Sequence, residues 1–336
     1  MRKVHRYYLL LTGICVVGLG VLLAGKWVTD SSWNNNHSQS NVTRRNTQEA
    51  GQDPSGDSKT TAEADSKQSE EQRENWINVS GDTLETRILP PEGYERKSVK
   101  GDSLTAFLRT YSMKKDGSDV RLYNGKKKGR KNVHAAVFKL PLEDVDLQQC
   151  ADSVMRVYAE YYWHTGQKEK IAFHFVDGFL AEYDKWQQGY RIEVGDSSSR
   201  WVKSASPDSS YECFQKYLRI VFSYASTLSQ EKESKRISIA KIEPGDIFIK
   251  GGSPGHVVMV VDVCENAEGR KAFLLAQGYM PAQEFHVLKN PAHQENPWYY
   301  VDEITYPFQT PEYTFKKGSL RRPEYRICLF HTVSKR

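Results

Sequence analysis

The chain has few cysteines, and they stand far apart. Five cysteines occur in 336 residues, and the two closest, Cys213 and Cys264, are 51 positions apart. This spacing excludes a CxxC zinc site and the dense disulfide framework of small secreted domains. The HExxH, GxxxxGK[ST] and GxGxxG patterns are absent as well, which argues against the commonest zinc-peptidase, P-loop and dinucleotide-binding chemistries. We therefore predict no metal site and no cofactor.

The chain also lacks a large excess of either charge. Lys and Arg number 47 against 42 Asp and Glu, so the formal net charge is +5, and 38% of the residues are hydrophobic. No helix-turn-helix, zinc-finger or RNA-binding signature accompanies this mild charge, so we expect no nucleic acid among the partners. The apolar content is that of a folded protein, long enough for one large domain or two small ones.

The first 27 residues carry a membrane-targeting pattern. Positions 1–6 contain three Lys or Arg residues, and the run over 7–25 is uncharged. A helix of that length is about 28 Å long, enough to cross a bilayer core. The basic flank predicts a cytoplasmic N-terminus and an extracytoplasmic remainder. A cleaved signal peptide and an uncleaved anchor both fit; because Leu23 stands where cleavage needs a small residue, we favour a single-pass anchor in the cell membrane.

A polar segment follows the membrane run. Positions 34–75 contain no aromatic residue, no Leu and no Ile, and Val42 is the only large apolar residue there. Such a composition buries too little apolar surface to offset the entropy of ordering, so we predict a disordered linker over 28–75. The folded, extracytoplasmic domain is then expected over 76–336.

A helical pattern near position 150 carries the first candidate catalytic residue. Apolar side chains recur at helical spacing over 146–161, and Asp146 suits the N-cap. The stripe consists of Cys150, Val154, Val157, Tyr158 and Tyr161. Cys150 is therefore expected in the first turn, where the positive end of the helix dipole favours a thiolate. The alternative is a core cysteine, because cysteine is among the most buried residue types.

A second candidate stands at the start of a buried strand. A Gly-Gly-Ser-Pro-Gly loop leads into a Val- and Met-rich run over 256–263, typical of a strand buried on both faces, and the chain returns through 273–277. With a hairpin centred between positions 266 and 267, His256 would face Gln277 directly, and both side chains would project to one side. A slip of one residue would separate them.

The order Gly-Asp, apolar strand, Gly-rich loop, Gly-His, apolar strand resembles the NlpC-type and CHAP-type cysteine amidases of bacterial cell walls. Those proteins are papain-like, so the resemblance implies an α+β fold with an antiparallel sheet packed against a cysteine-bearing helix. It implies Cys150 as the nucleophile, His256 as the base and Gln277 as the residue that orients the imidazole. The chain departs from that pattern in two ways. The cysteine and histidine are 106 residues apart, which requires an insertion, and Gln148-Gln149 replaces the usual Asp before a Ser-Gly pair.

At a larger scale the sequence resembles the family called domain of unknown function 4846. The matching stretches include ETRILPPEGYER, DLQQCADSVMR, GDIFIKGGSPGHVVMVVD and TPEYTFKKGSLRR, and they extend over about residues 84–322. This resemblance implies no activity, so any functional expectation rests on the smaller amidase-like pattern.

Several other residues carry weaker hypotheses. Gln149, Tyr279 and Gln283 are candidates for a substrate cleft, although a loop crossing the end of the sheet explains the last two equally well. Asp152 turns about 200° away from the cysteine and is expected in solvent. The basic run over 126–131 is expected to be a solvated hairpin tip, with teichoic acid or lipid head groups as an alternative contact.

Zinc is not supported by the histidine spacing. Neither His174 nor His286 lies at a short metal-ligand spacing from His256.

Two classes of function remain open from the sequence. The first is a membrane-anchored cysteine amidase or peptidase acting on peptidoglycan peptides or another amide outside the cell. The second is a binding or structural module of the cell envelope that keeps the same fold with an inert Cys150. Sugar binding through the many Tyr and Trp side chains has only composition in its favour.

Overall fold

The computed structural model describes residues 76–293 and 296–325. The predicted membrane run at 7–25 and the predicted linker over 28–75 lie outside these residues. None of the helices in the described ranges has the length and apolar character that crossing a membrane requires.

The described chain is α+β, as expected. Its α-helices are α3 (Leu84–Arg87), α4 (Leu104–Arg109), α5 (Cys150–His164), α6 (Tyr183–Gln187), α7 (Tyr211–Tyr224) and α8 (Thr227–Lys232). Three 3-10 turns are η1 (Lys168–Lys170), η2 (Ile239–Lys241) and η3 (Val301–Glu303). The strands are β1 (Tyr94–Glu95), β2 (His134–Val137), β3 (Ala172–His174), β4 (Leu180–Glu182), β5 (Tyr190–Val194), β6 (Ser199–Lys203), β7 (Ser234–Arg236), β8 (Ile247–Lys250), β9 (His256–Asn266), β10 (Lys271–Gln277), β11 (His286–Leu288), β12 (Tyr299–Tyr300), β13 (Phe308–Gln309), β14 (Thr314–Phe315) and β15 (Leu320–Pro323).

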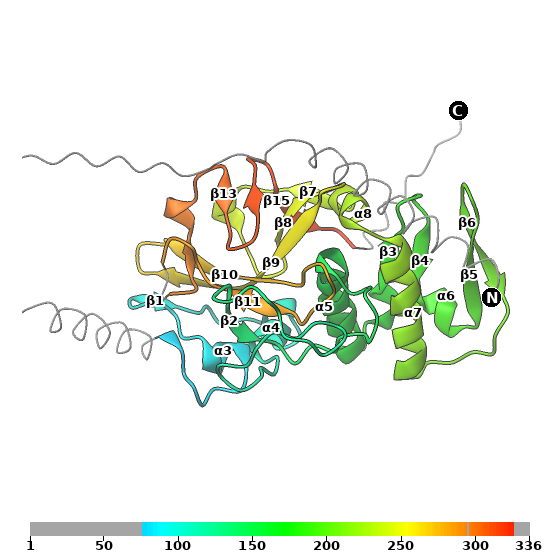
Figure 1. Cartoon of the computed structure of the whole chain (residues 1–336), viewed down its shortest axis with the longest axis horizontal. Coiled ribbons are helices and arrows are strands. Elements are labelled where there is room, and N and C mark those ends of the chain that lie inside the picture. Colours follow the sequence, from blue (N-terminus) through cyan, green and yellow to red (C-terminus); the bar gives the residue numbers. More distant parts are fainter. Residues whose placement is uncertain (1–75, 294–295, 326–336) are drawn as a thin grey trace, which may run out of the picture. The chain divides into compact units, whose positions relative to one another are not determined.

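Nine of these strands form one antiparallel sheet, which confirms the predicted sheet type. The order is β2-β11-β10-β9-β8-β15-β7, with β1 also paired to β9 and β12 also paired to β10. The long strands β9 and β10 lie at the centre (Figure 1). The Val- and Met-rich run therefore forms the middle of the sheet, where both of its faces are covered.

The two faces of the sheet belong to different hydrophobic clusters. On the first face, Val257, Met259 and Val261 join the core that includes α5 and α7. On the second face, Val258 and Val260 join a smaller core covered by chain from 299–320. Side chains alternate between faces along a strand, so the position of a residue in the strand decides which core it meets.

At the end of the hairpin that carries His256, the expected β9–β10 register is wrong by two residues. The observed pairs place Ala276 opposite Met259, so continuing this register puts Gln277 opposite Val258 and not opposite His256. His256 and Gln277 nevertheless share the second face, because a shift of two residues keeps the face of every side chain.

A β-bulge is what brings His256 to the same face as Gln277. Leu274 pairs with Asp262, but Leu275 pairs with Val260, so Val261 is an extra residue on β9. If the same residues paired without this shift in register, Gln277 would lie opposite Met259, and His256 would lie on the opposite face from Gln277.

Helix α5 packs on the first face and begins at the candidate nucleophile. Its N-cap is Gln149, not Asp146 as expected, and the Gln149 backbone N–H donates to Asp152 Oδ2 at 3.0 Å. Asp146 instead accepts a hydrogen bond from the Ala282 backbone N–H at 2.7 Å, which ties the lead-in of α5 to the loop after β10. In Figure 1, α7 lies on the other side of α5 from the sheet.

The long insertion between Cys150 and His256 has structure of its own. It contains the hairpins β3-β4 and β5-β6 together with α6, α7 and α8. It is attached to α5 through Arg156, which is fully buried and donates to Glu160 Oε1 at 2.7 Å and to Tyr211 of α7 at 3.1 Å.

Candidate functional site

The first turn of α5 meets the end of β10 at a glycine. A Cβ placed on Gly278 would lie 2.2 Å from Ser153 Oγ and 2.8 Å from the Gln149 carbonyl oxygen. No side chain fits there, so glycine is what lets the strand end touch the helix. This contact brings Cys150 beside the strand end that carries Gln277.

The Cys150 thiol is half-buried and lies close to backbone donors. The N–H groups of Cys150, Ala151 and Val257 all approach the sulfur and favour its charged form. Burial outweighs them and raises the pKa of the thiol to about 11, with a further increase from Asp152. The expectation that the helix dipole yields a thiolate is therefore wrong for the free protein, because desolvation is the larger effect.

Asp152 is not in solvent, contrary to expectation. Its side chain is 7% exposed and caps the helix through Oδ2, while the buried Oδ1 has no hydrogen-bond partner in the described part of the chain. Burial raises the pKa of this carboxyl to about 8. It is mostly protonated at neutral pH.

His256 and Gln277 form a buried pair on the second face. His256 Nε2 lies 2.8 Å from Gln277 Oε1, and the imidazole is 3% exposed. The rings of Tyr279 and Tyr313 each lie with centroids 4.9 Å from the imidazole. Burial lowers the pKa of His256 to about 4, opposed by the Gln277 bond and assisted by the nearby Lys128 charge. The imidazole is therefore neutral near pH 7.

The thiol lies at the backbone N–H of Val257, the residue after His256, and it is not bonded to the imidazole. Cys150 packs with the first-face core and its sulfur approaches the Val257 N–H, whereas the His256 ring contacts second-face side chains. Among the hydrogen bonds of the described residues, none joins Cys150 Sγ to His256. The structure thus brings His256 and Gln277 into contact and places Cys150 at the same end of the sheet.

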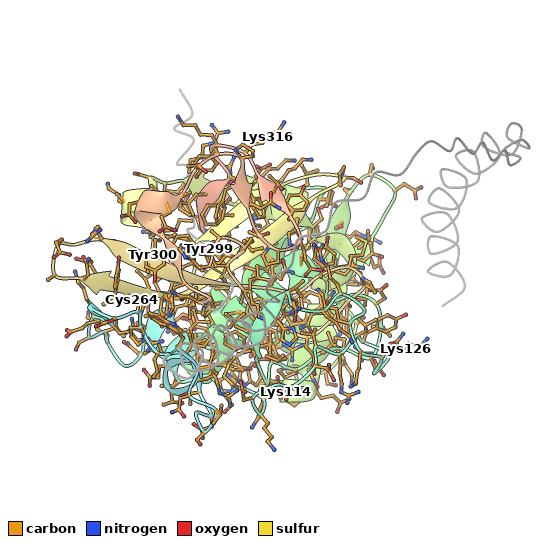
Figure 2. All side chains as sticks on the ribbon, turned by 60° about the vertical axis from the view of Figure 1, so that its left-hand side comes forward. Lys114, Lys126, Cys264, Tyr299, Tyr300 and Lys316 are labelled. Atoms are coloured by element: carbon orange, nitrogen blue, oxygen red, sulfur yellow. The ribbon has the colours of Figure 1, made fainter. Side chains whose placement is uncertain are left out.

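A buried ion pair between Lys128 and Glu312 is hydrogen-bonded to the other end of the Gln277 amide. Gln277 Nε2 donates to Glu312 Oε2 at 2.6 Å, and Lys128 Nζ donates to the same oxygen at 2.6 Å. The Lys128 and Glu312 side chains are only 8% and 4% exposed. The expectation that the whole basic run over 126–131 is a solvated tip is wrong for Lys128, although Lys126 lies at the periphery of the domain (Figure 2).

Sequence reasoning did not find Glu312. It stands 35 positions after Gln277 and belongs to no catalytic pattern, and only the folded chain places its carboxylate against the Gln277 amide. The partner lysine gave no signal either, since nothing in Lys126-Lys127-Lys128 distinguishes the third residue from the first two.

The three proposed cleft residues lie in different environments. Gln149 and Tyr279 are partly exposed beside Cys150, and the Tyr279 hydroxyl donates to the Glu312 carbonyl oxygen at 3.5 Å. Gln283 is 1% exposed and accepts from Lys128 Nζ at 2.9 Å. The assignment of Gln283 to an open cleft is therefore wrong; it supports the buried lysine.

The histidines within the described ranges do not assemble into a metal site. His286 is buried opposite Gln277, with Nδ1 2.8 Å from the Glu284 carbonyl oxygen, while His174 bonds to Glu233 in the insertion. In the residues that the structure describes, no group of three or more His, Cys, Asp or Glu side chains is arranged to hold a metal ion.

Comparison with known families assigns the larger part of the chain. The family model described as domain of unknown function 4846 matches residues 84–322. The chain belongs to this family. No curated protein and no solved structure matches the chain. In this member of the domain of unknown function 4846 family, the whole site from Cys150 to Glu312 lies within the matched range.

Proposed function

We propose that the protein is a membrane-anchored, extracytoplasmic cysteine amidase or peptidase, with peptidoglycan peptides as the substrate class. The observation that carries this proposal is the buried 2.8 Å contact between His256 Nε2 and Gln277 Oε1 at the sheet end beside Cys150. An amide oxygen at Nε2 leaves Nδ1 as the acceptor of the neutral ring, which is the form a general base needs.

Each residue has a defined part in the reaction. His256 Nδ1 takes the thiol proton, and Cys150 Sγ attacks the amide carbonyl carbon. The Cys150 backbone N–H and a neighbouring backbone N–H stabilise the oxyanion that forms. The imidazolium then returns its proton to the leaving amine as the C–N bond breaks. Water attacks the resulting thioester, and His256 again handles the proton, so the free acid and the starting enzyme are formed.

The resting state in this proposal is a neutral thiol and a neutral imidazole. Burial raises the pKa of Cys150 to about 11 and lowers the pKa of His256 to about 4. Proton transfer must then accompany the binding of substrate. Catalytic contacts are often long in a free enzyme and tighten only around the substrate, which fits the missing thiol–imidazole bond.

A non-catalytic envelope module is the second candidate. The observation in its favour is that Cys150 packs with the core on the first face of the sheet, whereas the His256 ring lies on the second face. In such a module Cys150 would serve packing alone, and the imidazole would have no effect on its reactivity.

Thiol alkylation separates the two candidates. The full chain is treated with iodoacetamide between pH 5 and pH 9, and labelling of each cysteine is followed by peptide mass. For an enzyme, Cys150 should react faster than the buried Cys213 and Cys264, and His256→Ala should slow that labelling about tenfold or more below pH 9. Labelling that is indifferent to His256→Ala, or that needs unfolding, contradicts the amidase.

Hydrolysis is then tested directly. The full chain is incubated with purified peptidoglycan, and new amine termini are identified by mass spectrometry. Cys150→Ser should abolish their release, whereas Cys213→Ser, a change at a buried cysteine of α7, should not.

A further inference from the structure

The buried pair behind Gln277 has a chemical consequence for His256. An ionised glutamate has only acceptor atoms, whereas an amide has a donor end and an acceptor end. Glu312 Oε2 lies 2.6 Å from the Gln277 side-chain nitrogen. The NH2 group of Gln277 must therefore face Glu312, and its oxygen must face the imidazole.

The orientation of the amide fixes the proton of the imidazole. Gln277 Oε1 can only accept, so His256 Nε2, at 2.8 Å, must be the nitrogen that carries hydrogen. In a neutral ring the other nitrogen, Nδ1, then has the free lone pair. The position of one proton is thus decided by a carboxylate two hydrogen bonds away.

Lys128 places a positive charge beside the Glu312 carboxylate. A buried carboxylate without a cation tends to take up a proton, and a protonated glutamate can donate. Lys128 Nζ lies 2.6 Å from Glu312 Oε2 and is held by the Gln283 oxygen and the face of the Tyr279 ring, 5.0 Å from its centroid. These contacts keep a charge opposite the carboxylate inside the protein.

We propose that Glu312, paired with Lys128, is a positioning residue that keeps the His256 proton on Nε2 and leaves Nδ1 free. The use of Nδ1 as a base rests on the proposed function, whereas the tautomer itself does not. The Glu312 side chain bonds to Gln277 and Lys128, and no bond in the described residues joins it to Cys150, so it acts through Gln277.

The test reads the tautomer directly. The full chain, labelled with 15N at histidine, is studied by long-range 1H–15N correlation near pH 7.5, and His256→Gln assigns the signal. The wild type should show a single tautomer, protonated at Nε2. In Glu312→Gln the new amide can donate or accept, so the Gln277 amide can turn over and both tautomers should become populated.

A second variant provides the same test in case Glu312→Gln fails to fold. Lys128→Met combined with Glu312→Gln removes both buried charges and should give the same mixture of tautomers. The matched control is Glu284→Gln, which breaks another part-buried Lys–Glu pair, with Lys114, that has no bond to Gln277. The control should keep the wild-type tautomer.

The outcomes separate this inference from the proposed function. A pure Nε2–H tautomer in Glu312→Gln and in the double variant would overturn the positioning role, whatever the enzyme does. A mixed tautomer with no effect on Cys150 labelling would sustain the positioning role and count against the amidase. If the positioning role and the amidase are both correct, equal populations of the two tautomers should slow the labelling of Cys150 about twofold, because half of the molecules lack a free Nδ1.

Discussion

Two buried acidic side chains anchor this domain, and they differ in what they are connected to. Asp262 on β9 is fully buried and bonds to Arg109 Nε at 2.9 Å and to Arg96 Nε at 2.5 Å. Glu312 bonds to one cation, Lys128, and to one neutral amide, Gln277. Both satisfy the rule that buried charges are paired, but only one leads onward to a titratable ring.

The Asp262 cluster consists of Asp262, Arg96 and Arg109. We call it closed, because its charged groups form hydrogen bonds only with one another and with the backbone. The remaining guanidinium nitrogens of Arg109 and Arg96 donate to backbone carbonyl oxygens, including those of Lys97 at 2.7 Å and Ile88 at 2.6 Å. The cluster therefore fastens β1 and α4 to the sheet and carries no further chemistry. Asp262 lies within β9, which continues to Asn266. The Glu312 cluster consists of Lys128, Glu312, Gln277 and His256. We call it open, because its hydrogen bonds lead to a neutral imidazole that can take up a proton.

The largest expected effect comes from breaking the closed cluster. Asp262→Ala leaves the buried Arg109 and the part-buried Arg96 without a counter-charge and should reduce the free energy of unfolding by about 3 to 5 kcal/mol. Urea unfolding followed by tryptophan fluorescence measures the loss. The exposed Asp302, 3.8 Å from Arg270, is the control, and Asp302→Ala should change stability by less than about 1 kcal/mol. Equal effects of the two changes would contradict the structural role of Asp262.

The open cluster should make the free energy of unfolding depend on pH. His256 has a pKa of about 4 in the folded chain against an ordinary value of 6.5, so the unfolded chain binds more protons between those values. Its contribution to stability is complete above pH 6.5 and is lost as the pH falls toward 4. The loss should reach about 3 kcal/mol, since each pKa unit corresponds to about 1.4 kcal/mol. Unfolding curves from pH 4 to 7.5 should show a smaller slope in His256→Gln.

Two other groups serve to check the sign of that slope. Hydrogen bonding to Glu233 raises the pKa of His174, so His174→Gln should change the slope in the opposite direction. Burial raises the pKa of Asp152 to about 8, so Asp152 also opposes His256 over this range, and the comparison must be made between each variant and the wild type. A His256→Gln slope equal to that of the wild type would contradict the neutral, buried imidazole.

A smaller effect is expected for the cation of the open cluster. Lys128→Met leaves Glu312 buried without its counter-charge and should reduce the free energy of unfolding by about 2 kcal/mol. Adding Glu312→Gln should recover part of the loss, and a double-mutant cycle gives the coupling. Additive losses would mean that the two side chains do not interact.

The elements that could be predicted from the sequence are those with a local signal. The stripe from Cys150 to Tyr161 identified α5, and the Val- and Met-rich run identified β9, because amphipathic and fully buried patterns follow directly from periodicity.

The site was harder to predict because its contacts are not local. Lys128, Gln277 and Glu312 come from a hairpin, a strand and a loop, and no short pattern records that they meet. The state of Cys150 was also beyond a sequence argument. A helix start can be recognised from neighbouring residues, but the desolvation that raises the pKa of the thiol depends on the whole fold.

The extra residue at Val261 ties the shared face of His256 and Gln277 to the number of residues in β9. Adding one residue between His256 and Asp262 beside the existing bulge would leave a hydrophobic strand of nearly the same composition and length. It would also move the imidazole to the side of the sheet that faces α5 and away from the Gln277 amide. Loss of Val261 together with the bulge would not, because the pairs Leu274–Asp262 and Leu275–Val260 would both stay. Relatives of this chain should therefore be compared by the number of residues between this histidine and this aspartate together with the presence of the bulge, a property that similarity scores do not measure.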